Sequence, residues 1–206
     1  FNGFRELRSV WKRFSSHPIL KSYIGAFFVF SMAVQTVMLI AAYFGEQEVN
    51  WGSLSEKQTG LIVSIMIIQL IAIVGAILTA RCSERFGNLP VLIALNFIWV
   101  SLCLYAFFVV TPTQFYIAAG FVGLSMGGIQ SLARSTYSKY IPKTDDTASF
   151  FSFYSTSQMT GIVLGMLLFG TIDQVTGSMR NSVLFFLSFF LIGAFLLIRL
   201  HRKSAV

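Results

Sequence analysis

Four glutamine side chains, at positions 35, 69, 130 and 158, lie deep within long apolar segments of this chain. An unpaired amide costs several kcal/mol in hydrocarbon, so these groups are expected to point toward protein or solute rather than lipid. They can hold a polar solute, or they can simply bond to neighbouring helices. With four hydroxyl-bearing residues of the same segments they form the predicted substrate pathway: Gln35, Thr36, Gln69, Ser125, Gln130, Ser131, Tyr154 and Gln158.

One of these hydroxyls also fits a hydrolytic motif. Residues 123–127 have the Gly-x-Ser-x-Gly pattern of the rhomboid intramembrane proteases, with Ser125 as the nucleophile. Such a serine needs a histidine base on another span. His17 and His201 both fall at the ends of apolar segments, too far from Ser125. We therefore treat a protease as a remote alternative and expect the chain not to be an enzyme. The sequence has no metal-binding cluster, and no cofactor is expected.

The segments that hold these residues are long enough to cross a membrane. The chain is 55% hydrophobic and 11% charged, with a mean hydropathy of +0.74, whereas soluble domains carry about 25% charge. Uncharged runs of 24, 23, 48, 26 and 18 residues separate the charges, and Pro112 divides the longest run. Because a crossing needs about 20 residues, this pattern predicts an all-α membrane protein with six spans. The expected spans are 22–44, 58–80, 88–110, 114–142, 147–171 and 181–199.

The distribution of Lys and Arg predicts the orientation. Thirteen of the 15 cations lie before the first span, in the second and fourth loops, or after the last span; only Lys57 and Arg180 lie on the other side. The positive-inside rule then places both termini in the cytoplasm. The net charge of +7 is not a nucleic-acid signal, since the cations lie between apolar runs.

Residues 1–18 differ in character from the rest. Phe4, Leu7, Trp11 and Phe14 recur at three- and four-residue steps among basic residues, which predicts an amphipathic cytoplasmic helix. We interpret 1–18 as a connector and 19–206 as a six-helix transmembrane domain. The sequence begins at Phe1 rather than Met, which suggests that it is a fragment.

The expected fourth span, 114–142, combines glycines with polar residues. Gly120, Gly123, Gly127 and Gly128 let another helix or a ligand approach closely. The segment therefore fits either a pathway-lining helix or a helix packed tightly against its neighbour. The last span, 181–199, is almost wholly apolar and is expected to face lipid.

A short internal repeat relates the first and fourth spans. Residues 33–36 read Ala-Val-Gln-Thr, and residues 128–131 read Gly-Ile-Gln-Ser. The two spans run in opposite directions, as the corresponding helices of inverted repeats do. The pattern favours two inverted three-helix repeats.

The loop at 80–89 resembles a transporter signature. Glu84, Arg85 and Gly87 match the Gly-x-x-x-Asp-Arg-x-Gly pattern between the second and third helices of each half of the major facilitator superfamily, with Glu for Asp. The resemblance implies half of a major facilitator fold, and the basic segment before it implies the C-terminal half. Glu84 and Arg85 can form a cytoplasmic latch with helix ends of the opposite half, which would break as the transporter changes state, or they can be an ordinary exposed pair. The predicted latch residues are Glu84, Arg85, Gly87 and Arg134, although Arg134 can instead anchor its span at the interface.

Within that superfamily, residues 34–36, 44–45, 127–135 and 141–142 resemble the branch of vacuolar amino-acid effluxers linked to autophagy and their bacterial relatives. The resemblance implies alternating-access export of a small solute such as an amino acid, here across a bacterial inner membrane. The expected partners are that solute, the lipid bilayer and the missing N-terminal six-helix half; the isolated half is expected to self-associate. The alternative is a non-transporting membrane scaffold. All eight acids lie in loops or at span ends, so this half offers no proton relay.

Overall fold

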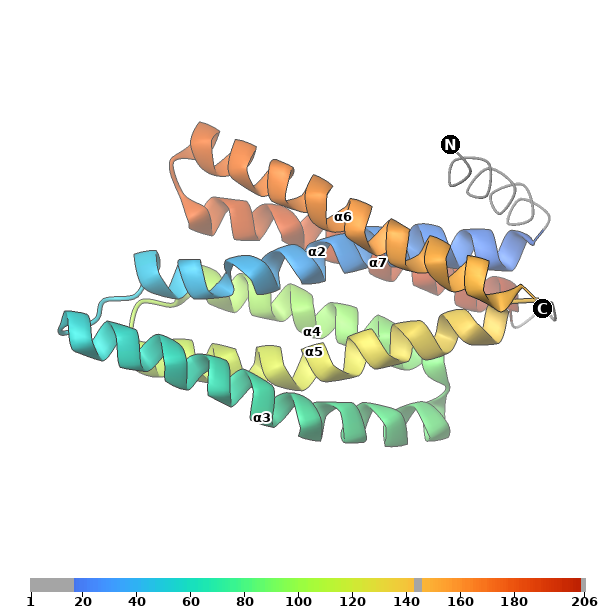
Figure 1. Ribbon diagram of the computed structural model, residues 1–206, viewed down its shortest axis with the longest axis horizontal. Coiled ribbons are helices and arrows are strands. Elements are labelled where there is room, and N and C mark those ends of the chain that lie inside the picture. Colours follow the sequence, from blue (N-terminus) through green and yellow to red (C-terminus); the bar gives the residue numbers. More distant parts are fainter. Residues whose placement is uncertain (1–16, 143–145, 205–206) are drawn as a thin grey trace.

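The computed structural model describes residues 17–142 and 146–204, which form six long helices and, within those ranges, no strand (Figure 1). All six are long and apolar enough to cross a membrane, which confirms the predicted all-α membrane fold and its number of spans. The expected connector, 1–18, lies almost entirely outside the described residues. The helices are α2 (Pro18–Glu48), α3 (Leu54–Phe86), α4 (Asn88–Phe108), α5 (Pro112–Tyr140), α6 (Thr147–Thr176) and α7 (Met179–Ser204).

Local sequence explains where the helices begin and end. The Ser53 side chain accepts a hydrogen bond from the Glu56 N–H at the start of α3, and Thr111 and Gln114 form a reciprocal capping box on α5. These side chains satisfy N–H groups that have no partner within the helix. Gly87 alone separates α3 from α4, at φ +87°, a conformation that side-chain-bearing L residues rarely adopt.

The helices alternate in direction, so the start of α2 and the end of α7 lie at the same end of the bundle (Figure 1). We call this end, which holds Pro18, Gly87, Pro142 and Ser204, the basic end. The main pairs are α3 with α5, α2 with α6, α2 with α7, α4 with α5, and α4 with α7. Exchanging α2–α4 for α5–α7 converts the pair α4 with α7 into itself and each other pair into another of the set. The helices α2 and α5 run oppositely, as inverted repeats require. The pairing is unequal, because α3 packs along α5 far more extensively than α6 along α2.

The core lies where α7 packs against α2 and α4. Phe186, Phe190 and Leu197 of α7 are fully buried, and the Phe190 ring stacks on Trp99 of α4 at 5.4 Å. The opposite face of α7 is exposed, with Phe195 64% accessible. The expectation that this span faces lipid is therefore wrong for one of its faces. A span that is apolar all round carries no polar residue to mark its core side.

Glycines bring α3 and α5 into backbone contact. A Cβ on Gly127 would collide with the Ala72 carbonyl of α3, and a Cβ on Gly75 would collide with the Leu124 carbonyl of α5. This close approach is typical of small residues at membrane helix interfaces. Of the two interpretations of the 114–142 segment, tight helix packing is thus correct for this pair.

Arg180 joins three helices at the end opposite the basic end. Its Nε donates to the Glu48 carboxylate of α2 at 2.7 Å, and Nη1 donates to the Phe107 carbonyl of α4 at 2.7 Å. Its Nη2 donates to the carbonyls of Val109, at 2.8 Å, and Glu48, at 3.2 Å. One guanidinium at the start of α7 thereby satisfies carbonyls at the C-terminal ends of α2 and α4.

Candidate functional site

A cavity of about 440 Å³ lies between α2, α5 and α6, in the half of the bundle nearer the basic end. Its apolar wall includes Phe27, Phe30, Val34 and Ile129. Besides Ser131, the polar lining comes as three pairs spaced four residues apart, one pair on each helix. Residues four apart share a helix face, so each helix presents two polar groups to the same space. These pairs are Ser31 and Gln35, Gln130 and Arg134, and Tyr154 and Gln158.

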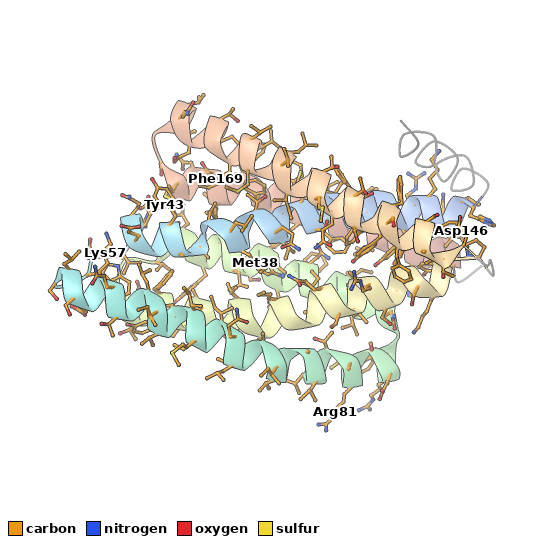
Figure 2. All side chains as sticks on the ribbon, viewed as in Figure 1. Met38, Tyr43, Lys57, Arg81, Asp146 and Phe169 are labelled. Carbon is orange, nitrogen blue, oxygen red and sulfur yellow. The ribbon has the colours of Figure 1, made fainter. Side chains whose placement is uncertain are left out.

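The amides at this cavity have few partners within the protein. Gln130 Nε2 donates to the Met38 sulfur at 3.6 Å, across the α2–α5 contact; Figure 2 shows Met38 midway along α2. Sulfur is a weak acceptor. Gln35 and Gln158 have no hydrogen-bond partner in the described part of the chain. The amide groups are therefore available to a bound solute or water.

Two hydroxyls at the cavity differ in their bonding. Ser131 lies beside Gln130 and donates to the carbonyls of Gly127 and Gly128, at 2.9 and 3.1 Å. Ser31 is 5% exposed and its Oγ is buried with no hydrogen-bond partner. A buried polar group without a hydrogen-bond partner lowers stability. A ligand in the cavity could supply the partner that the Ser31 hydroxyl lacks.

Arg134 lies over an aromatic ring at the cavity wall. Its guanidinium carbon is 5.9 Å from the centroid of the Tyr154 ring, within the range of a cation–π contact. Tyr154 in turn stacks on Phe27 of α2, with centroids 4.1 Å apart. No carboxylate of the described residues lies within 4.0 Å of the Arg134 side-chain nitrogens. The cavity therefore combines amides, a free hydroxyl and one positive charge.

Three residues of the predicted pathway lie elsewhere. Thr36 is buried, donates to the Met32 carbonyl and lies against Gly165 of α6. Ser125 is 1% exposed and donates to the Phe121 carbonyl. Gln69 is exposed, contrary to the expectation that all four amides point inward, because α3 buries only its small residues. The structure thus brings Gln35, Gln130, Ser131, Tyr154 and Gln158 together; a role in transport stays a prediction for all eight.

Comparison with known proteins places the chain in a family. The model of the family described as "Vacuole effluxer Atg22 like" matches residues 1–206. The chain belongs to this family.

Its relatives include bacterial and fungal proteins. The Atg22-like chain is 30% identical to the uncharacterized MFS-type transporter YxiO of Bacillus subtilis, over 95% of this chain and 44% of that protein. It is 27% identical to the autophagy-related protein 22 of Yarrowia lipolytica, over 97% of this chain and 35% of that protein. It is also 27% identical to the autophagy-related protein 22 of Eremothecium gossypii, over 81% of this chain and 34% of that protein. The chain therefore spans less than half the length of these relatives.

These matches confirm the expected branch of the major facilitator superfamily, and the six long apolar helices agree with a multi-pass membrane protein. The matched family and the bacterial relative are described as an effluxer and a transporter, which agrees with the expectation that the chain is not an enzyme. The geometry agrees with this, since the Ser125 hydroxyl bonds within its own helix and the two histidines lie exposed at the basic end. Among the described residues, no group of three potential metal ligands occurs.

The predicted latch of the Atg22-like chain lies at the basic end. Glu84 and Arg85 are exposed in the last turn of α3, and the Arg85 guanidinium lies over the Phe86 ring at 5.4 Å. Gly87 turns the chain sharply, with its N–H donating to the Ser83 carbonyl. No ion pair joins Glu84, Arg85 or Arg134 to another described residue. Their role as a latch therefore stays a prediction.

Sequence reasoning missed two polar residues of the cavity: Arg134, which it assigned to the latch, and Ser31. Serine is common in membrane helices, and its hydroxyl usually bonds to the carbonyl four residues earlier, as in Ser64 and Ser125. The available signal was position: Ser31 lies four residues before Gln35 and must share its face.

Proposed function

We propose that this chain is the C-terminal half of a secondary transporter that exports a small polar solute, such as an amino acid, by alternating access. The observation that carries the proposal is the cavity between α2, α5 and α6, where three helices converge with amides that lack strong partners. These amides are partly exposed at the cavity and can therefore bond to a ligand or to water when the protein is at work. A family of effluxers supports the direction of export.

The missing N-terminal six-helix half is the proposed partner. Large apolar side chains of α3 are exposed, among them Ile62, Leu70 and Ile73, each more than 60% accessible. A partner half would cover part of this surface and close the cavity from the other side. Glu84, Arg85 and Gly87, exposed at the basic end, are the proposed latch to that half. The same surface supports self-association of the isolated half.

The charge pattern supports the orientation that goes with export. Eight of the ten Lys and Arg residues in the described ranges lie toward the basic end, so we place this end in the cytoplasm, in a bacterial inner membrane. The cavity then lies in the cytoplasmic half, where a solute leaving the cell would enter.

Thermal unfolding of the full-length protein in detergent, with and without candidate amino acids, tests this function. A bound solute raises the melting temperature as its concentration passes the dissociation constant. We expect Gln35→Ala and Gln130→Ala to weaken this response at least about tenfold in solute concentration, as the loss of one or two hydrogen bonds predicts.

Gln174→Ala is the matched control, because Gln174 is exposed near the end of α6, far from the cavity. It should respond to solutes like the unmodified protein. Equal responses in all three variants would remove the cavity assignment. If no solute of a broad panel is bound or transported in proteoliposomes, the scaffold alternative replaces the proposal.

A further inference from the structure

The cavity between α2, α5 and α6 carries a net positive charge. Of the described residues that line it, Arg134 alone is charged. None of the six acids in the described part of the chain lines the cavity, and none of them forms an ion pair with Arg134. The Arg134 residue is exposed and lines the partly apolar cavity without a counter-ion among the described residues, so its charge can attract an anionic ligand.

The hydrogen-bond donors of Arg134 are free to bind a ligand. The guanidinium carbon lies 5.9 Å from the centroid of the Tyr154 ring, and that ring stacks on Phe27. A guanidinium carries five N–H donors in one plane. None of these donors has a hydrogen-bond partner among the described residues. A planar, bidentate acceptor such as a carboxylate fits these donors.

Ser31 provides a second, independent indication of a ligand. Its Oγ is buried and unpaired, although Ser64, Ser125 and Thr36, on comparable membrane helices, all donate to the carbonyl four residues earlier. The hydroxyl of Ser31 therefore lacks the usual local bond and lines the same cavity as Arg134. A ligand with several oxygen or nitrogen atoms would satisfy both groups.

From these observations we infer that the cavity binds the carboxylate of a small organic solute through Arg134, with Ser31 and the cavity amides binding its remaining polar groups. The inference rests on the proposed transport function and names its substrate class. A single guanidinium balances one negative charge, which favours a carboxylate over a doubly charged phosphate. The apolar wall of Phe27, Phe30, Val34 and Ile129 favours a solute that also has an apolar part.

The test compares matched ligands on the full-length protein. The probes are leucine, phenylalanine and glutamine, each beside its carboxamide, which lacks the carboxylate, together with inorganic phosphate. Binding is measured by thermal shift and transport is measured in proteoliposomes. We expect the acids to bind about 10- to 100-fold more tightly than their amides, as the loss of a charge-assisted hydrogen bond predicts.

Variants at position 134 assign this preference to its residue. Arg134→Gln should reduce the acid-over-amide ratio to near one, whereas Arg134→Lys, which keeps the charge but not the fork of donors, should retain part of it. Arg81→Gln is the matched control, because Arg81 is exposed at the end of α3 and points away from the bundle (Figure 2). It should keep the full ratio.

Several results would overturn the inference while leaving the transport function intact. These are equal binding of acids and amides by the unmodified protein, an unchanged ratio in Arg134→Gln, or tighter binding of phosphate than of any acid. The first and third comparisons need no variant, so they decide the matter even if Arg134→Gln fails to fold. If the folded protein binds and transports none of the probes, the proposed function and this inference fail together.

Discussion

Ser31 and Ser64 show how surroundings change the contribution of the same side chain to stability. Both are buried in membrane-spanning helices, at 5% and 2% exposure. Ser64 donates to the Gly60 carbonyl at 2.8 Å, whereas the Ser31 hydroxyl has no partner. A satisfied hydroxyl contributes modestly to stability, and an unsatisfied one lowers it.

Opposite effects of alanine at these two positions are therefore expected. In the absence of solute, Ser31→Ala should raise the free energy of unfolding by about 1 kcal/mol, because it removes an unpaired polar group. Ser64→Ala should lower it by about 1 kcal/mol, because it removes a made hydrogen bond. Denaturation of the full-length protein in detergent measures both. A decrease in stability for Ser31→Ala would mean that its hydroxyl is bonded after all.

At the residue scale, the sequence predicted the depth of polar groups better than their direction. Distance along an apolar segment placed Gln35, Gln130 and Gln158 correctly, and the structure gathers them at one cavity. The same reasoning could not separate them from Gln69, which is exposed. Direction depends on which side of each helix meets its neighbours, and apolar residues on all sides of a membrane helix conceal that information.

At the scale of helices, the long uncharged runs defined all six spans, and the turn at Pro112 divided the longest of them as the structure shows. Which helices would pack together could not be predicted in the same way. The extensive contact between α3 and α5 depends on glycines of both helices meeting each other's carbonyls. The spacing of glycines in the sequence indicates that a helix can be approached closely, but it does not indicate which helix packs there.

Substitution of these glycines tests that contact. Gly127→Ala places a methyl group against the Ala72 carbonyl, so we expect the free energy of unfolding to fall by about 1–3 kcal/mol. Gly25→Ala is the control, since a Cβ there meets nothing within 4 Å and alanine favours helix by up to about 1 kcal/mol. Thermal denaturation of both variants should show shifts of opposite sign. Similar shifts would argue against close packing of α3 on α5.

At the scale of the whole molecule, Arg180 links the two three-helix units. It begins α7 and bonds to the ends of α2 and α4, which belong to the other unit. Its side chain and that of Glu48 are each 22% exposed, so solvent weakens the pair little. The nearby pair of Lys57 and Glu46, at 3.1 Å, is more exposed, with Glu46 at 46%.

Arg180→Lys should therefore destabilise the protein by about 2–3 kcal/mol, because lysine keeps the charge but cannot satisfy the carbonyls of two helix ends together. Lys57→Ala should change stability by less than about 1 kcal/mol, as expected for an exposed ion pair. Chemical denaturation at constant ionic strength gives both values. Equal effects would show that Arg180 acts only as a surface charge.

The inverted repeat could be predicted from the sequence, but its asymmetry could not. The four-residue internal repeat pairs Gln35 with Gln130, and both of these residues line the cavity. Its last members differ, since Ser131 lines the cavity and Thr36 packs against Gly165. That difference follows from the uneven pairing of α3 with α5 and of α2 with α6, which depends on side-chain shape across the whole interface.

The connection at Gly87 has a practical consequence for following motion in this protein. With a single residue between α3 and α4, the chain has no slack there, and the adjoining ends of these helices stay at nearly constant separation in every state. Spectroscopic labels at the end of α3 and the start of α4 would therefore give a reference distance that stays constant in every state. A change in the distance between a label on α6 and these two labels would then report movement of the cavity wall, rather than distortion of the whole bundle.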